Sequence, residues 1–247
     1  MFAVVFDFDG TILDSETAEF ESHQQLFTEC GATLTLEEWC EGVGIVTPAD
    51  HWFVRLCDRA THPPVDYDEF VQRRRANFRA RVRWEPMRGI GELLDELTGA
   101  GVPCAVASAA TSDWVVRALG DLRLTGRFDA VVTGDQVVRG KPAPDVYLEA
   151  ARRLDIDPCR CVAVEDSGPG LAAAGAAGMT TVVIPHTLSV NHDFASADLR
   201  VSHAGELTLA RLQRLIDSGR LRKDGHDGTK AWPRRSRRPR KKPQNPS

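Results

Sequence analysis

The stretch "FAVVFDFDGT", residues 2–11, decides the fold of this chain of 247 residues. The apolar run 2–6 has the pattern of a buried strand, and two aspartates, Asp7 and Asp9, follow it directly. Burying one unpaired carboxylate is costly, and a second one nearby raises that cost. The sequence therefore predicts that this strand ends at a site where a positive group or a chemical role accounts for both charges.

Further apolar runs of the strand type recur later in the chain, at 102–108, 129–135, 161–167 and 180–185. Helical patterns alternate with them, at 90–101, 113–122, 144–156 and 167–179. Apolar strands that alternate with helices are typical of a parallel sheet covered on both faces. We therefore expect an α/β fold with a Rossmann-like parallel sheet core, in which right-handed crossovers bring the carboxyl ends of all strands to one edge.

The stretch 16–85 differs from the rest because it has helical patterns and no clear apolar strand. Such an insertion directly after the first strand is typical of an α-helical cap domain over the active-site edge. We therefore predict a core of 1–15 and 86–219, a helical cap of 16–85 and a tail of 220–247. The tail is rich in Pro and Arg, so we expect it to be disordered.

Charge is distributed unevenly along the chain. Eleven Lys or Arg residues and two Asp residues lie within 220–247, a charge of +9, so the other 219 residues carry about −13 of the net −4. The acidic body is not expected to bind nucleic acid in general. The basic tail is either a flexible appendage or a contact for nucleic acid or an acidic partner.

Apolar runs and cysteines bear on location. No apolar run approaches the about 20 residues that span a bilayer, and the N-terminus lacks the pattern of a secretory signal. We therefore expect no membrane insertion and a cytoplasmic location. The six cysteines form no CxxC pair, which favours free thiols in a reducing compartment.

Polar side chains close the predicted strands: Asp7 and Asp9 the first, Ser108 the second, Lys141 after the third, and Glu165 and Asp166 the fourth. Clustered carboxylates without Cys or His suit Mg2+. Lys141, the only Lys before residue 223, fits a phosphate group together with the Ser108 hydroxyl and the next backbone N–H, that of Ala109. A carboxylate beside Mg2+ can attack phosphorus, and a second carboxylate can transfer the protons.

At these residues the sequence resembles the haloacid dehalogenase (HAD) superfamily. "DFDGT", Ser108, "GKPAPD" (140–145) and "VEDSGPG" (164–170) are similar to its four motifs, in the same order, over about residues 3–185. The insertion resembles the cap of β-phosphoglucomutase-like and phosphoglycolate phosphatase-like members. The resemblance assigns the site residues as follows: Asp7 as nucleophile and metal ligand, Asp9 as acid/base and metal ligand through its carbonyl, Asp166 as metal ligand, Ser108, Ala109 and Lys141 as phosphate-binding residues, and Glu165 and Thr11 beside the metal.

The resemblance implies a Mg2+-dependent phosphatase that hydrolyses a small phosphorylated metabolite through an aspartyl-phosphate. Haloacid dehalogenases lack the second aspartate, so Asp9 argues against dehalogenation. Phosphonatases use a cap lysine, and this cap contains no Lys. A phosphomutase of the β-phosphoglucomutase type stays an alternative, although such members have a His where this chain has Glu19. A non-catalytic HAD-like binding module is a weaker alternative, because no motif is missing.

Three features of the predicted cap bear on specificity. The loop 41–50 corresponds to a segment that approaches the active site in similar proteins, so we expect it to set the substrate. Trp52 and Arg55 either face the substrate or belong to the core of the cap and its rim. The Arg-rich stretch 73–83 is expected to form a solvated face.

Overall fold

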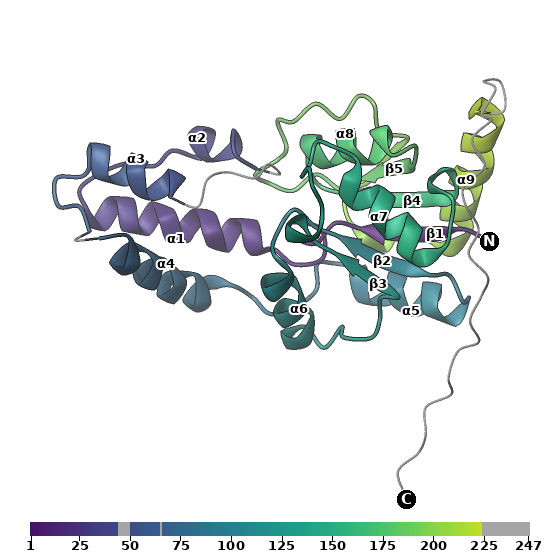
Figure 1. Ribbon diagram of the computed structural model, residues 1–247, viewed down its shortest axis with the longest axis horizontal. Coiled ribbons are helices and arrows are strands. Elements are labelled where there is room, and N and C mark those ends of the chain that lie inside the picture. Colours follow the sequence, from purple (N-terminus) through teal and green to yellow (C-terminus); the bar gives the residue numbers. More distant parts are fainter. Residues whose placement is uncertain (44–49, 65, 224–247) are drawn as a thin grey trace, which may run out of the picture.

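A computed structural model describes residues 1–43, 50–64 and 66–223. Within them, six parallel strands form one sheet in the order β3-β2-β1-β4-β5-β6. The strands are β1 (Ala3–Phe6), β2 (Cys104–Ala107), β3 (Ala130–Val132), β4 (Cys161–Glu165), β5 (Thr180–Val183) and β6 (Leu199–Arg200). Because β1 lies between β2 and β4, its carboxyl end reaches the middle of the sheet edge (Figure 1). The predicted fold class is confirmed, and β6 is a strand that the sequence did not predict.

Helices cover both faces of the sheet (Figure 1). One face carries α5 (Ile90–Gly99), α6 (Ser112–Asp121) and α9 (Leu209–Lys223), and the other carries α7 (Asp145–Leu154) and α8 (Gly168–Ala176). Side chains alternate along β1, so Val4 and Phe6 join the first core and Ala3 and Val5 join the second. All four are completely buried. Burial on both faces is the reason that the strand is apolar throughout.

Four helices between β1 and α5 form the inserted cap, at the left of Figure 1. They are α1 (Ser15–Glu29), α2 (Leu36–Cys40), α3 (His51–Arg59) and α4 (Tyr67–Arg81). The described part of the cap contains no strand. It has its own apolar core, which includes Leu26, Phe27, Leu56 and Phe70. The boundaries at 15/16 and 85/86 stay a prediction.

Ion pairs join the two long helices of the cap. The guanidinium of Arg73 lies 2.7 Å from Glu29, and that of Arg74 lies 2.7 Å from Glu19. The Arg-rich stretch is therefore more than a solvated face, because two of its members hold α4 against α1. Trp52 stacks on Trp39 with 4.8 Å between ring centroids, and so belongs to the packing of the cap.

Three short 3-10 helices also lie within the described part of the core, at Gly134–Gln136 (η1), Pro158–Arg160 (η2) and Ala204–Glu206 (η3). Helix α9 continues to Lys223, four residues into the predicted tail. The rest of the tail, 224–247, and most of the predicted specificity loop, 44–49, lie outside the described residues. Among the described residues, no helix is long and apolar enough to cross a bilayer. None of the six cysteines is joined in a disulfide.

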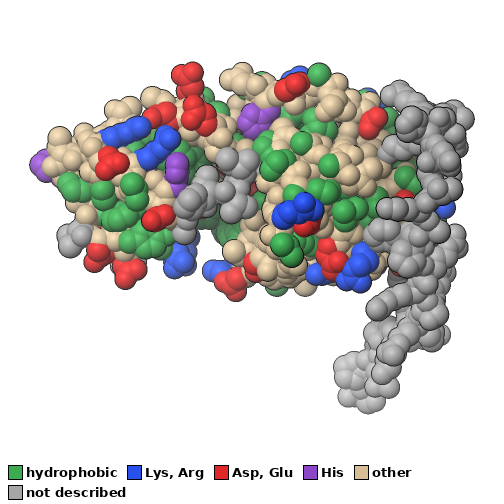
Figure 2. Space-filling view, turned by 45° about the horizontal axis from the view of Figure 1, so that its top comes forward, with side chains coloured by type: hydrophobic (Ala, Val, Ile, Leu, Met, Phe, Trp, Pro, Cys, Tyr) green, Lys and Arg blue, Asp and Glu red, His purple; other side chains and the backbone are tan. Residues whose placement is uncertain are grey.

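The surface of the described residues has a mixed charge. On the face shown in Figure 2, acidic and basic side chains are interspersed over both the cap and the core. Many cap arginines are also paired with glutamates, as in Arg59–Glu38 and Arg81–Glu21. The expectation that the body does not bind nucleic acid in general stays a prediction.

Candidate active site

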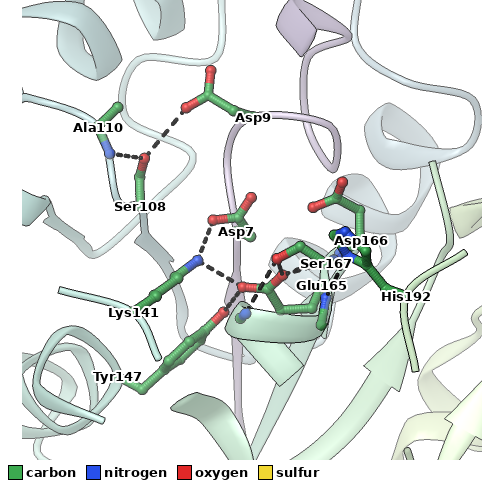
Figure 3. A network of polar contacts seen from close by, with 12 residues as sticks. Asp7, Asp9, Ser108, Ala110, Lys141, Tyr147, Glu165, Asp166, Ser167 and His192 are labelled. Atoms are coloured by element: carbon green, nitrogen blue, oxygen red, sulfur yellow. Dashed lines mark hydrogen bonds and ion pairs between the residues drawn. The ribbon is translucent and has the colours of Figure 1, made fainter. Parts of the chain in front are cut away.

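The carboxyl ends of β1 and β4 bring three predicted acidic residues together (Figure 3). The register pairs Phe6 with Val164, so Asp7 and Glu165 follow at the same level of adjacent strands. Asp166 comes next in the chain. All three carboxyl residues are at most 6% exposed. The close approach of these strand ends, which the sequence predicted, is therefore present in the fold.

Lys141 reaches this group from the loop between η1 and α7. Its ammonium contacts Asp7 Oδ1 and donates a hydrogen bond to Glu165 Oε1 at 2.6 Å. Burial alone would lower the pKa of Lys141, but the two neighbouring carboxylates raise it above its ordinary value. Lys141 thus stays charged and is one of the positive groups that the buried aspartates require.

Glu165 is held by four further donors. The hydroxyl of Tyr147, from α7, donates to Oε1 at 2.5 Å. The hydroxyl of Ser167 donates to Oε2 at 3.0 Å, and the backbone N–H groups of Asp166 and Ser167 each approach the same oxygen at 3.2 Å. Sequence reasoning missed Tyr147, because a tyrosine among apolar residues of a helix has the pattern of a core residue.

Two glycines leave room for the carboxylates. Gly10 has a φ of +81°, and a Cβ there would overlap the carboxylate of Asp166. Gly170 lies in the first turn of α8, where a Cβ would overlap the carboxylate of Glu165. These contacts give a physical reason for a glycine at each of the two positions.

The three carboxyl groups fit a divalent cation. Asp7, Glu165 and Asp166 each offer an oxygen, and these oxygens lie within 4.8 Å of one another. Burial, together with repulsion between the neighbouring carboxylates, raises the pKa of Asp7 to about 8 and that of Asp166 well above its ordinary value. Asp166 Oδ2 is buried and accepts no hydrogen bond within the described part of the chain. An oxygen-only set with an unpartnered buried acceptor suits Mg2+.

In Figure 3, Asp9 lies above Asp7, whereas Glu165 lies below it, and the Asp9 carboxyl group is directed toward Ser108. Its Oδ1 accepts hydrogen bonds from Ser15 Oγ at 2.5 Å and from Trp114 Nε1 at 2.9 Å. Its Oδ2 lies 3.5 Å from Ser108 Oγ. Burial raises the pKa of Asp9, whereas the two hydrogen bonds to Oδ1 lower it. Neither Ser15 nor Trp114 was identified from the sequence.

Two of the predicted phosphate-binding residues, Ser108 and Ala109, lie at the end of β2. Ser108 is 1% exposed, and its hydroxyl accepts a hydrogen bond from the Ala110 N–H at 3.0 Å. Ala109 packs against Gly134, where a Cβ would overlap the Ala109 carbonyl. Thr11 is buried, and its hydroxyl has no hydrogen-bond partner among the residues described here. The structure thus brings Ser108 to Asp9 but, among the described residues, shows no hydrogen bond from the Thr11 hydroxyl.

The sequence model for haloacid dehalogenase-like hydrolases matches residues 4–184. The chain belongs to the haloacid dehalogenase-like hydrolase family. The resemblance predicted from the four motifs is therefore confirmed, and so is the prediction of a hydrolase of this class.

Relatives within the HAD family include phosphatases and sugar-phosphate enzymes. The chain is 35% identical to "Putative phosphatase YhcW" of Bacillus subtilis, over 85% of this chain and 95% of that one. Two solved structures also share the fold. CbbY from Rhodobacter sphaeroides, a mutant in complex with xylulose-(1,5)bisphosphate, is 28% identical over 86% of this chain and 99% of that one, with a TM-score of 0.69. A "putative beta-phosphoglucomutase" from Thermotoga maritima is 27% identical over 88% and 99%, with a TM-score of 0.70.

The cap contributes further carboxylates near the HAD motifs. Arg74 Nη1 lies 2.7 Å from both oxygens of Glu19, the residue that the family resemblance places where β-phosphoglucomutase-like members have a His. Burial, together with the charges of the Asp9 and Glu19 carboxyls, raises the pKa of Glu16 to about 8. Sequence reasoning did not identify Glu16, since a glutamate in the first turn of a helix is an ordinary feature.

Proposed function

We propose that this protein is a Mg2+-dependent phosphatase that hydrolyses a small phosphomonoester through an aspartyl-phosphate on Asp7. The observation that carries the proposal is the position of the Asp7 carboxylate, between the ammonium of Lys141 and the carboxyl group of Asp166 (Figure 3). A nucleophilic carboxylate, a cation for the phosphoryl oxygens and an acidic metal site then lie together at one strand end.

The metal would be held by the carboxylates of Asp7 and Asp166 and by the backbone carbonyl of Asp9. Glu165 already accepts hydrogen bonds at both oxygens, which favours a place beside the metal for this residue. When bound, Mg2+ would neutralise charge on the phosphoryl oxygens and so favour attack by the Asp7 carboxylate. Lys141, the Ser108 hydroxyl and the Ala109 N–H would bind the remaining phosphoryl oxygens.

Asp9 supplies the proton transfers. In the first step an Asp7 oxygen forms a bond to phosphorus, the bond from phosphorus to the ester oxygen breaks, and the Asp9 carboxyl gives its proton to that oxygen. In the second step water attacks phosphorus, Asp9 takes the proton of the water, and the Asp7–phosphorus bond breaks. Inorganic phosphate leaves and both aspartates return to their starting states.

Several observations support a small metabolite as the substrate. The relatives include a named phosphatase and a CbbY mutant solved with a sugar bisphosphate. A mutase of the β-phosphoglucomutase type is the second candidate, supported by the T. maritima structure. The pairing of Glu19 with Arg74 disfavours it, because a carboxylate held by a guanidinium does not replace the histidine of those mutases. Contact of the tail with nucleic acid or an acidic partner stays a prediction, as does the cytoplasmic location.

The test is hydrolysis of 4-nitrophenyl phosphate with Mg2+ and with a chelator, by the full chain and by Asp7→Asn. We expect Mg2+-dependent turnover that the variant loses, because an amide is neither a nucleophile nor a good Mg2+ ligand. Denaturant unfolding of the variant checks that its fold is intact. Substantial Mg2+-dependent turnover by Asp7→Asn would refute the role of Asp7. A panel of sugar phosphates, phosphoglycolate and nucleotides then identifies the substrate class, and production of an isomeric sugar phosphate would favour the mutase.

A further inference from the structure

Trp114 makes a hydrogen bond to the acid/base candidate that no motif of the sequence indicates. Its indole Nε1–H donates to Asp9 Oδ1 at 2.9 Å. Ser15 Oγ donates to the same oxygen at 2.5 Å, whereas Oδ2 accepts only a long hydrogen bond of 3.5 Å, from the hydroxyl of Ser108. The two oxygens of one carboxyl group are therefore in different environments: Oδ1 has two donors, and Oδ2 faces the predicted phosphate-binding residue.

We propose that Trp114 is a positioning residue that fixes Asp9 so that Oδ2 is the oxygen that carries and transfers the proton. The inference rests on the proposed function, in which Asp9 protonates the leaving group. A proton on Oδ1 would compete with the indole N–H of Trp114, which can only donate, and would also require the Ser15 hydroxyl to turn. A proton on Oδ2 leaves both bonds to Oδ1 intact and requires only that the Ser108 hydroxyl turn from donor to acceptor.

The chemistry follows from this assignment. In the first step the Oδ2–H bond breaks and its proton passes to the ester oxygen, while the phosphorus–oxygen bond breaks and Asp7 bonds to phosphorus. In the second step Oδ2 accepts a proton from the attacking water. Through both steps the indole N–H and the Ser15 hydroxyl stay on Oδ1, so the carboxyl group does not rotate between its two roles.

Three aromatic rings hold the indole of Trp114 in place. Phe8, which lies between the two motif aspartates, packs edge-on against it at 6.4 Å. Phe78, from α4 of the cap, also packs edge-on, with 5.5 Å between ring centroids. Trp84, from the segment that returns to the core, has its ring centroid 6.1 Å from that of Trp114. Trp114 therefore touches the core, the cap and their connection.

A packing role alone makes a different prediction from a positioning role. Trp114→Phe keeps an aromatic ring among Phe8, Phe78 and Trp84 but removes the N–H donor. If Trp114 only packs, the loss of activity is the same for every ester. If Trp114 positions the acid, the loss grows as the leaving group becomes more basic, because a poor leaving group depends most on protonation.

The experiment measures kcat and KM with Mg2+ for 4-nitrophenyl phosphate and phenyl phosphate. For Trp114→Phe we expect kcat to fall about tenfold on phenyl phosphate and much less on 4-nitrophenyl phosphate, with KM nearly unchanged. The matched control is Trp84→Phe, which removes an indole N–H from the same aromatic group without touching Asp9. For this control, the ratio of kcat on 4-nitrophenyl phosphate to kcat on phenyl phosphate should equal that of the wild type. Equal losses on both esters in Trp114→Phe would overturn the inference.

A second measurement does not depend on the folding of Trp114→Phe. Of the five indole N–H signals expected from the chain, we expect one to shift strongly in the nitrogen–proton NMR spectrum of Asp9→Ala, which has no acceptor oxygen in its side chain, and the other four to change little. If no indole signal shifts, the hydrogen bond is absent in solution and the inference fails. The kinetics of Asp9→Asn distinguish a failure of the role of Trp114 from a failure of the proposed function. If the loss of kcat in Asp9→Asn is the same for both esters, the acid role of Asp9 in the proposed function fails.

Discussion

The hydroxyl of Tyr147 donates a 2.5 Å hydrogen bond to Glu165 Oε1 in the interior of the protein. Both residues are at most 1% exposed. The ring of Tyr147 also lies 5.1 Å from the ammonium of Lys141. Helix α7 thus helps to fix the carboxylate that holds the lysine beside Asp7.

Tyr147→Phe tests this support. The variant keeps the ring beside Lys141 but removes one donor from a buried carboxylate, so we expect the free energy of unfolding to fall by about 1–3 kcal/mol. We also expect a lower kcat, because Lys141 is less firmly held between its two partners. Urea unfolding and steady-state kinetics measure the two effects. An unchanged free energy of unfolding would show that the hydrogen bond contributes nothing.

Lys141→Arg tests the need for a compact cation. The side chain of Lys141 is 2% exposed and enclosed by Asp7 and Glu165, so a planar guanidinium does not fit the same space. We expect kcat/KM for 4-nitrophenyl phosphate to fall by about a hundredfold or more. The control is Arg139→Lys, two residues away, whose side chain is 67% exposed in its pair with Asp145 and should leave turnover nearly unchanged. Activity of Lys141→Arg close to the wild type would argue against a specific role for the ammonium.

Two glycines of helix α8 offer a matched pair of variants. A Cβ at Gly170 overlaps the carboxylate of Glu165, whereas a Cβ at Gly175 meets no atom within 4 Å. Gly170→Ala should therefore displace Glu165 and reduce both stability and turnover. Gly175→Ala should raise the free energy of unfolding by about 0.5–1 kcal/mol, since alanine favours the helix. Thermal unfolding and kinetics of both variants check the prediction, and equal behaviour of the two would contradict it.

Much of the fold and of the site follows from local patterns. The apolar run of β1 predicts a strand buried on both faces, and the order of strands and helices predicts a parallel sheet. Carboxyl ends of parallel strands share one edge, so Asp7, Glu165 and Asp166 could be expected together before any contact was known. The motif order of the HAD family strengthens the same expectation.

The parts that the sequence did not predict depend on contacts between distant segments. Trp114 and Tyr147 have the pattern of core residues in amphipathic helices, and only the packing shows that their polar atoms reach Asp9 and Glu165. Arg74 pairs with Glu19, although 55 positions separate the two residues in the sequence. Strand β6 has two residues, too few for any alternation of apolar and polar side chains to be visible.

His23 makes the stability of the cap depend on pH. Its ring is buried against Trp39 and Phe70, and burial lowers the pKa of His23 to about 3 from an ordinary value of 6.5. Below pH 6.5 the unfolded chain binds a proton at this residue that the folded protein does not bind. The contribution of a neutral His23 is therefore fully present above pH 6.5 and is lost progressively as the pH falls toward 3.

His23→Phe removes this titration while it keeps a ring in the aromatic group. Between about pH 7 and pH 5, the free energy of unfolding of the wild type should fall more steeply than that of the variant. Urea unfolding at several pH values measures both slopes, and the other ionisable groups cancel in the comparison. Parallel curves would mean that His23 is accessible to protons in the folded cap.

The last prediction concerns the basic segment that follows α9. The helix ends at Lys223, and residues 224–247 keep eight of the eleven basic residues of the predicted tail. Their Pro-rich composition offers no apolar periodicity, so the sequence predicts that they add nothing to the core. A chain cut after Lys223 should therefore keep its kcat and its melting temperature.

The same truncation tests the electrostatic role of the segment. Any binding of the full chain to heparin or DNA that weakens with salt should disappear in the shortened chain, because the remaining body is acidic. Retention on a heparin column at increasing salt measures this, with the full chain as the reference. A truncated protein that still binds heparin would place the basic site on the folded body. A large loss of kcat on truncation would instead show that the segment contributes to the active fold.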